Sequence, residues 1–440
     1  MTQSLPATHP RSNEEGKLIP CFFRPRFPPS CVPEVPEDLP LDVIVRFEEM
    51  LRRWKAIFTG KPQDYEAFSF SYPGDEPADF EDWCENAALL LGLLDLGRPV
   101  LVVSSAHVEI KTLPWGASLP ISSQRNNIGQ PILALNGASD DIPDIDINGT
   151  SSPGPSIILG MGMKADGSLI PGAWPKSLPG KEIFTHNAET DPASNYWRNP
   201  AFKRLAGREF DIGAPEDQET NEYPDVKQII RSMTDKHDRY VTKILTSHKH
   251  WPLWFSPAIP AGQRTEKQIE HEMYEAFDYE LEHHDPFVLV SEYVEMFYEY
   301  RIFFVAGKVV CGAGCIESFS PPWNDGEAFD LKVEKHRNGS EVVKRPALIK
   351  RYVDFAQKAI DEFGRHDPAF LHGVIDLALM RHTDNASTSA RPRVEIGVIE
   401  VNSARSAGQY ALRTDLFVKA LAEAMDAEVN GAKFPGERSV

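Results

Sequence analysis

The sequence has few cysteines, no long apolar run and fewer basic than acidic residues. Its five cysteines among 440 residues are scattered and lack the C-x-x-C spacing of a zinc site or redox dithiol, so we interpret them as reduced and mostly structural. No stretch reaches the roughly 18 uncharged apolar residues of a membrane span, and the first thirty residues lack the apolar run of a signal peptide. We therefore expect a cytoplasmic protein with no membrane partner.

The charge balance narrows the class of partner. Subtracting 65 acidic from 46 basic residues gives a formal charge of -19, which disfavours a nucleic-acid partner. Apolar residues make up 41% of the chain, enough for more than one core, and the length predicts two or three domains. Small-molecule substrates are the expected partners, and a homodimer stays open.

The first half of the chain predicts a tail followed by an α/β domain. Residues 1–40 are rich in proline and indicate a tail or linker. Residues 41–223 begin with two helical patterns and a short apolar strand, which is typical of an α/β layer. Within them, 137–156 is a polar insertion whose DIDING motif imitates a calcium loop but has Pro155 where a bidentate glutamate is needed.

Regular patterns become clear from Pro224. VKQIIRSM predicts an amphipathic helix, residues 239–245 alternate as a strand, and LWFSPAI is its expected hairpin partner. Thr265 and Gln268 form a capping-box pair ahead of the next helix. Residues 287–294 predict a strand.

The remaining pattern alternates strands and helices. Two strands are expected around the turn Ala306-Gly307, then a helix over 347–363 that Gly364 ends. Two apolar strands follow, around Asp376 and Glu400, and a helix over 413–426 comes last.

A carboxylate and an amide lie two residues apart on the last apolar strand. Alternation sends Glu400 and Asn402 to one face while Val401 faces the other way. Asp376 adds a carboxylate from the preceding strand, which could pair with this one. Hard divalent cations take oxygen ligands and commonly bridge nucleotide phosphates, so these residues predict a magnesium site. Isolated surface carboxylates are the alternative, but buried neighbours on each strand favour partnered charges.

The order of motifs resembles the ATP-grasp superfamily over about residues 224–426. The matching elements are the lysine of VTKIL, the acidic-aromatic pair of VSEYV, the acid and arginine of EYRIFF, then VID and VIEVNSARSAGQY. The ending is similar to a short-core branch found in bacterial and phage-type proteins. The resemblance implies two α+β subdomains that clamp ATP, here 224–295 and 296–440, behind an N-terminal α/β domain.

The resemblance also implies roles for residues on the first subdomain. Lys243 would place its ammonium among the α and β phosphates. Glu292 would accept hydrogen bonds from ribose or adenine, and the backbone of Tyr293 and Val294 would meet the adenine edge. The alternatives are an exposed strand lysine for Lys243 and ordinary core packing for Tyr293.

Two arginines and an acid complete the implied site. Arg301 would face the γ-phosphate, with Glu299 orienting it or touching the metal; a cross-strand ion pair is the alternative. Arg405 would bind the transferred phosphate or an acyl carboxylate. The family's metal ligands map onto Asp376, Glu400 and Asn402. The chain departs from the family after the lysine strand, where SHKHWPLWFS contains no glycine, so the phosphate-covering loop is unassigned.

The expected activity is an ATP- and Mg²⁺-dependent ligation of a carboxylate to an amine through an acyl phosphate, with release of ADP. Three alternatives remain. One is an ATP-dependent phosphotransferase acting on a small acceptor. Another is a non-catalytic ATP-binding assembly factor, and the last is a structural protein in which the motifs are fortuitous.

Overall fold

The structure is a computed structural model that describes a defined part of the chain. Those residues are 21–23, 27, 31–58, 78–98, 100–103, 111–112, 118–119, 132–135, 157–159, 193, 195–214, 223–245, 253–283, 287–337, 339, 341–382, 393–404 and 407–429. The polar insertion at 137–156, Arg405 and the glycine-free segment His248–His250 therefore lie outside the described residues. No helix among the described residues is long and apolar enough to cross a membrane.

The chain divides into two compact units. One comprises Met1–His186, Phe319–Asn324 and Arg413–Val440, and the other comprises Asn187–Ser318 and Asp325–Leu412. The predicted boundary at Pro224 lies inside the second unit, because a strand just before it joins that unit's first sheet. The last predicted helix groups with the N-terminal unit.

The first unit contains a four-stranded sheet in the order β5-β2-β1-β6. Its strands are β1 (Cys21–Phe23), β2 (Val100–Val103), β5 (Ile132–Leu135) and β6 (Ile157–Leu159), and two short strands, β3 (Lys111–Thr112) and β4 (Ser118–Leu119), pair separately. β1 runs parallel to β2 and β6, and Phe23 is fully buried. The proline-rich segment predicted as a tail therefore supplies an inner strand.

Three helices of this unit follow the sequence pattern closely. They are α1 (Leu41–Phe58), α2 (Phe80–Asp95) and α7 (Thr414–Val429). Asp79 caps α2 by accepting a hydrogen bond from the Asp82 amide, and Gly97 follows the helix with φ +67°. α7 packs on α2, where a Cβ built on Gly92 would lie 3.3 Å from Val418. The described cysteines Cys31, Cys84, Cys311 and Cys315 are free.

The second unit begins with a small antiparallel sheet in the order β7-β10-β8-β9. The elements are η3 (Tyr196–Arg198), α3 (Pro200–Leu205), β7 (Phe210–Gly213), α4 (Val226–Thr234), β8 (Tyr240–Ile244), β9 (Trp254–Phe255), α5 (Glu266–His283) and β10 (Val288–Glu292). α4 and α5 share one apolar core with alternate residues of β8 and β10. Lys243 pairs with Leu289, whose side chain belongs to a separate core that includes residues of α3 and Phe210 of β7. Lys243 therefore lies on the face of the sheet opposite α4 and α5.

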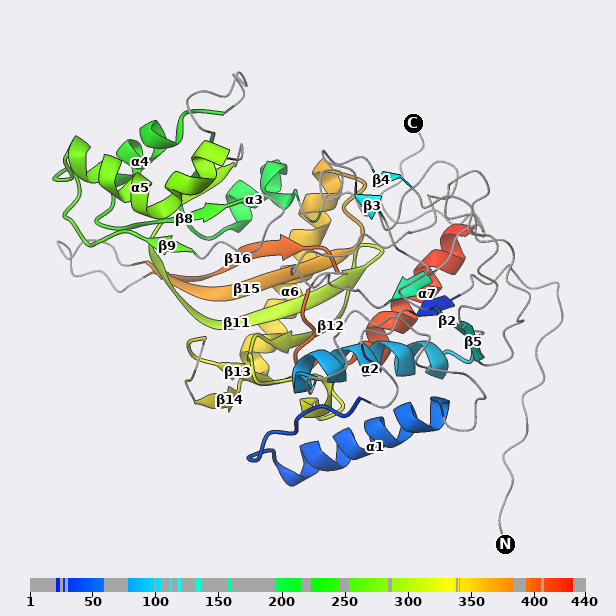
Figure 1. Cartoon of the computed structure of the whole chain (residues 1–440). Coiled ribbons are helices and arrows are strands. Elements are labelled where there is room, and N and C mark those ends of the chain that lie inside the picture. Colours follow the sequence, from blue (N-terminus) through cyan, green and yellow to red (C-terminus); the bar gives the residue numbers. More distant parts are fainter. Residues whose placement is uncertain are drawn as a thin grey trace, which may run out of the picture. The chain divides into compact units, whose positions relative to one another are not determined.

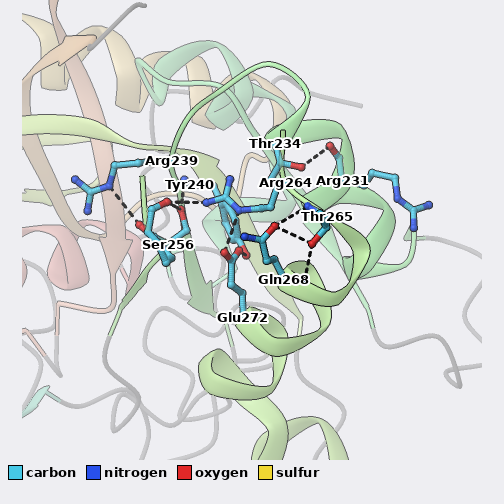
Figure 2. A network of polar contacts seen from close by, with 10 residues as sticks. Arg231, Thr234, Arg239, Tyr240, Ser256, Arg264, Thr265, Gln268 and Glu272 are labelled. Carbon is cyan, nitrogen blue, oxygen red and sulfur yellow. Dashed lines mark hydrogen bonds and ion pairs between the residues drawn. The ribbon is translucent and has the colours of Figure 1, made fainter. Parts of the chain in front are cut away.

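A buried polar network joins β8 to α5 (Figure 2). Arg264 and Glu272 form an ion pair with side chains 1% and 4% exposed, and the Tyr240 hydroxyl donates to Glu272 at 2.8 Å. At the start of α5, the Thr265 amide donates to the Gln268 side chain at 2.8 Å, which confirms the predicted capping box.

A second antiparallel sheet, in the order β12-β11-β15-β16, carries the C-terminal motifs. Its strands are β11 (Val294–Val305), β12 (Lys308–Gly314), β15 (Gly373–His382) and β16 (Val394–Asn402), and the same unit contains β13 (Lys332–Glu334), β14 (Val342–Lys344) and α6 (Pro346–His366). The short helix η4 (Pro321–Trp323) belongs to the first unit. Figure 1 shows α6 behind this sheet. Gly364 does not end α6, which continues to His366, so that prediction was wrong.

Two bulges, one in β11 and one in β16, lie opposite neighbouring residues of β15. Tyr298 and Glu299 of β11 stand opposite one residue of β15, and Tyr298 has a left-handed φ of 56°. On the other side, Ile399 of β16 is the extra residue between the pairs Asp376–Glu400 and Leu377–Val398. Bulges of this kind bend a strand and redirect the side chains that follow. Arg301 lies two residues after the bulge in β11, and Glu400 lies directly after the bulge in β16.

Candidate functional site

Strand register places three charged side chains in one row across the second sheet. Arg301 of β11 pairs with Asp376 of β15, which pairs on its other side with Glu400 of β16. Paired residues of neighbouring strands lie on the same face. Ile375 and Leu377 flank Asp376 and enter the core shared with α6, so Asp376 and its row lie on the opposite face. Asn402, two residues beyond Glu400, joins them.

Arg301 and Asp376 form a two-pronged ion pair. The Arg301 Nε and Nη2 atoms donate to the Asp376 Oδ1 and Oδ2 atoms, both at 2.8 Å, and Nη1 donates to the Gly408 carbonyl at 3.0 Å. Asp376 is fully buried and Arg301 is 7% exposed. Burial alone would lower the pKa of Arg301, but the Asp376 carboxylate raises it well above its ordinary value. Asp376 therefore holds this guanidinium, and the role of Glu299 in orienting Arg301 or touching a metal stays a prediction.

Glu400 connects the two sheets of the unit. One of its carboxylate oxygens is paired with the Lys243 ammonium of β8, and the other accepts a hydrogen bond from Asn402 Nδ2 at 2.8 Å. Asn402 Nδ2 also lies 3.3 Å from Asp376 Oδ2. Burial disfavours the charge on Lys243, but Tyr196 and Glu400 favour it, and the net pKa is raised. Five predicted residues thus form one continuous polar network.

Glu299 lies at the edge of this network, partly buried beside other carboxylates. Its pKa is raised to about 7, first by burial and then by the Asp376 carboxylate, with a further contribution from Glu400. Arg337 opposes this increase from 3.7 Å away. A carboxyl group with a pKa near neutrality in a cluster of acids is typical of a site that receives a cation or moves a proton.

The other predicted nucleotide contacts lie at the junction of β10 and β11. The Glu292 carboxylate is 8% exposed and accepts a hydrogen bond from the Glu209 amide at 2.7 Å. The Tyr293 amide already donates to the Arg239 carbonyl at 3.2 Å, and the Arg239 guanidinium lies 4.1 Å from the centre of the Tyr293 ring. The roles of Glu292, Tyr293 and Val294 toward adenine and ribose stay predictions.

The chemistry of the donor set fits a hard divalent cation. Asp376, Glu400 and Asn402 bring two carboxylates and an amide to one face, and a half-turn of the Asn402 amide would present its oxygen in place of Nδ2. The carboxylates now bond to Arg301, Lys243 and Asn402. Within the described part of the chain, no three His, Cys, Asp or Glu side chains are grouped as a metal site would group them.

Three contributors to this region were not predicted from the sequence. The Tyr196 hydroxyl is buried and faces the charges of Lys243 and Glu400. Arg208 interacts with the charges of both Glu400 and Glu292. Arg337 pairs with Glu317 at 3.1 Å and lies near Glu299. Tyr196 and Arg208 precede the first clear periodic pattern, so no motif marked them.

The fold and this site define the class of protein. Two sheets bring together a lysine, an arginine and three oxygen-bearing side chains from the motifs on which the ATP-grasp resemblance rests. Residues 229–420 match a family described as an ATP-grasp domain, so the chain contains a domain of the ATP-grasp superfamily. This confirms the resemblance over about residues 224–426. No curated protein matches the sequence.

Several solved structures are similar to this chain. One is a RimK domain protein ATP-grasp from Sphaerobacter thermophilus, with 12% identity, a TM-score of 0.36, and coverage of 80% of this chain and 97% of that one. The D-alanine-D-alanine ligase from Coxiella burnetii has 11% identity and a TM-score of 0.32 over 54% of this chain and 58% of its own. Phosphoribosylamine–glycine ligase from Thermotoga maritima has 14% identity and a TM-score of 0.32 over 56% and 57%. The chain thus spans just over half the length of either ligase, and likenesses this weak carry no conclusion about its reaction.

Proposed function

We propose that this protein is an ATP- and Mg²⁺-dependent ligase that joins a carboxylate to an amine and releases ADP and phosphate. The observation that supports this most directly is the pairing of each site cation with a carboxylate suited to a metal. Lys243 is paired with Glu400, and Arg301 with Asp376. Two cations and two carboxylates in one network match the opposite charges of a nucleotide triphosphate and its magnesium ion.

Nucleotide binding would replace one set of partners by another. Phosphate oxygens would take the place of Glu400 at the Lys243 ammonium, and Glu400 would become available to the cation. Magnesium, when bound by Asp376, Glu400 and Asn402, would neutralise charge on the phosphates. Arg301 keeps a planar fork beside Asp376, and its charge would stabilise the oxygens of the transferred phosphoryl group.

The proposed reaction has two steps. A carboxylate oxygen of the substrate attacks the γ-phosphorus, the bond from that phosphorus to the bridging oxygen of ADP breaks, and an acyl phosphate forms. An amine then attacks the acyl carbon, the bond to phosphate breaks, and the amine gives up a proton. Glu299, with its pKa near 7, is the residue we assign to accept that proton.

Substrate recognition would use the cations at the edge of the network. The Arg337 side chain is 47% exposed and lies next to Glu299, so its guanidinium is available to a substrate carboxylate. Arg405 remains predicted to bind the transferred phosphate or an acyl carboxylate. The carboxylate and amine themselves are not specified by these residues.

Product analysis tests this proposal. Purified protein is incubated with ATP, Mg²⁺ and a panel of carboxylates and amines, and ADP release and new products are measured. We expect ADP release that needs both partners and yields an amide. ADP with a stable phosphoester would instead indicate a phosphotransferase. ATP binding without turnover on any acceptor pair would indicate a binding protein, and no ATP binding by calorimetry would contradict a nucleotide site altogether.

A further inference from the structure

Arg208 connects the segment ahead of the family match to the last strand of the site. It lies just before β7, outside residues 229–420. Its Nη1 atom donates to the Val398 carbonyl at 3.1 Å and its Nη2 atom donates to the Ile399 carbonyl at 3.2 Å. These are the two residues that precede Glu400, and Ile399 is the extra residue of the β16 bulge.

The bulge explains why a guanidinium is suited to this place. A bulge takes its extra residue out of the regular ladder, and buried backbone carbonyls need another donor. A planar guanidinium offers two parallel N–H groups that reach two successive carbonyls, which the single ammonium of a lysine does less well. Arg208 thus fixes the backbone path by which β16 reaches Glu400.

Close backbone contact holds Arg208 in this position. Gly207 has a left-handed φ of +65°, and a Cβ built on it would lie 2.9 Å from Gly397 Cα. A Cβ built on Gly397 would lie 2.5 Å from the Ala206 carbonyl oxygen. Real Cβ atoms do not approach so closely, so only glycine at both positions lets the two backbones meet. The contact sets the distance from Arg208 to the bulge.

The carboxylate of Glu400 has other direct partners. Its oxygens bond to Lys243 and Asn402, while Arg208 interacts with Glu400 through the backbone and through its charge. We infer that Arg208 is a positioning residue, which holds the β16 bulge so that Glu400 is aimed at the divalent cation of the ATP-grasp site. This role depends on the proposed function only in its last step, the use of Glu400 by the cation.

The first test measures the bulge without nucleotide or metal. Hydrogen–deuterium exchange is followed in peptides that cover residues 396–402 in the wild type, Arg208→Met and Arg208→Lys. We expect about 10-fold faster exchange in Arg208→Met and an intermediate rate in Arg208→Lys, because one cation without the fork replaces only part of the interaction. Unchanged exchange in Arg208→Met would overturn the inference.

The second test measures the cation. Mg²⁺ is titrated calorimetrically into each variant in the presence of saturating ADP. We expect about 10-fold weaker Mg²⁺ binding in Arg208→Met, with partial recovery in Arg208→Lys, while ADP affinity without Mg²⁺ changes less than about 2-fold. Equal losses of ADP and Mg²⁺ affinity, or none, would contradict a role that acts through Glu400.

Arg264→Met is the matched control, because Arg264 is a buried arginine of the same unit whose ion pair lies within the small sheet and α5. It should speed exchange around α5 and leave both the 396–402 peptides and Mg²⁺ binding unchanged. If Arg264→Met also weakens Mg²⁺ binding about 10-fold, the effect of Arg208 reflects general loosening and the inference fails. If the wild type binds no Mg²⁺ with nucleotide, the proposed function fails, while the exchange measurement still decides whether Arg208 holds the bulge.

Discussion

Two buried arginine–carboxylate pairs in the same unit show how a structural ion pair differs from one in a site. Arg264–Glu272 and Arg301–Asp376 are nearly equally buried, with side-chain exposures of 1% and 4% against 9% and 0%. Both Arg264 and Arg301 also donate to a backbone carbonyl, at 2.6 and 3.0 Å. Burial and hydrogen-bond geometry therefore do not separate the two pairs.

The two ion pairs differ in the charged groups that surround them. Around Arg264, Glu272 also accepts a hydrogen bond from the Tyr240 hydroxyl, so these contacts link β8, α5 and the loop before α5 (Figure 2). Around Arg301, two further acids adjoin Asp376, and one of them, Glu299, has a strongly raised pKa. A surplus of like charge, held in place by neighbouring strands, is the feature that indicates a ligand. Variants of the two pairs and of their neighbours test this difference.

Glu400→Ala should abolish the activity. Loss of one carboxylate that we propose to bind magnesium should lower amine-dependent ADP formation by about 100-fold or more, because catalysis of this kind depends on neutralising phosphate charge. Circular dichroism should show an unchanged fold. Glu270→Ala, which removes an exposed acid from α5, is the control and should retain full turnover. Normal turnover in a folded Glu400→Ala protein would show that Glu400 of β16 is not needed for the reaction.

Arg264→Met should lower stability without changing the chemistry. It leaves Glu272 buried without its cation, which should reduce the free energy of unfolding by about 3 to 5 kcal/mol in urea titrations. At a temperature where the variant remains folded, kcat should equal that of the wild type. Arg301→Met should instead lose turnover even where it is fully folded. Similar effects of the two variants on kcat would contradict the view that Arg301 acts in the reaction while Arg264 acts only on stability.

Glu299→Gln should change how stability depends on pH. The folded-state pKa of about 7 exceeds the unfolded value of 4.5, so the folded protein keeps a proton that the unfolded chain loses. Stability should therefore fall as pH rises from 4.5 to about 7, and the full penalty should be present above that pH. In EDTA and without nucleotide, Glu299→Gln should be about 2 kcal/mol more stable than the wild type at about pH 8 and equal to it at about pH 4.

Parallel pH profiles for Glu299→Gln and the wild type would contradict a raised pKa of Glu299 caused by burial and by the Asp376 carboxylate. The substitution keeps the size of the side chain, so packing should contribute little to the comparison. In the proposed reaction, Glu299→Gln should also slow amide formation, and this loss accompanied by a gain in stability would be typical of a group kept for function.

Thr265→Ala should have the smallest effect. The variant loses the side chain that pairs with Gln268 at the start of α5, and unfolding in urea should show a loss of about 1 kcal/mol. ADP formation should be unaffected. A large loss of activity would mean that α5 and the network in Figure 2 influence the site more than their contacts indicate.

Local signals made much of the fold predictable from the sequence. Asp79 before α2, the Thr265–Gln268 pair and the turn Ala306-Gly307 each act within a few residues of the chain. Gly364 was wrongly predicted to end α6, because a single glycine inside a helix costs only about 1 kcal/mol, which packing of α6 offsets. β1 was missed because it is three residues long among prolines and exists only through pairing with β2 and β6.

The sequence predicted residues that lie together in the structure, but it did not predict how they pair. Alternation correctly placed Glu400 and Asn402 on one face, and Lys243 is held at the same network. Register between strands depends on bulges that no periodicity reveals, so the pairing of Arg301 with Asp376 was not predicted. Arg208 donates to the carbonyls of Val398 and Ile399, which lie 190 and 191 residues further along the chain. No local pattern in a single sequence connects residues this far apart.

The extra residue in β16 decides which face of the sheet Glu400 occupies relative to the residues before it. Val398 and Glu400 are two residues apart, a spacing that strict alternation would place on one face, yet Val398 lies in the core shared with α6 and Glu400 lies opposite Asp376. Deleting Ile399 would leave a regular ladder in which Val398 still pairs with Leu377 and Glu400 still pairs with Asp376. Such a deletion would therefore remove the bend of the bulge while keeping the order of the paired residues.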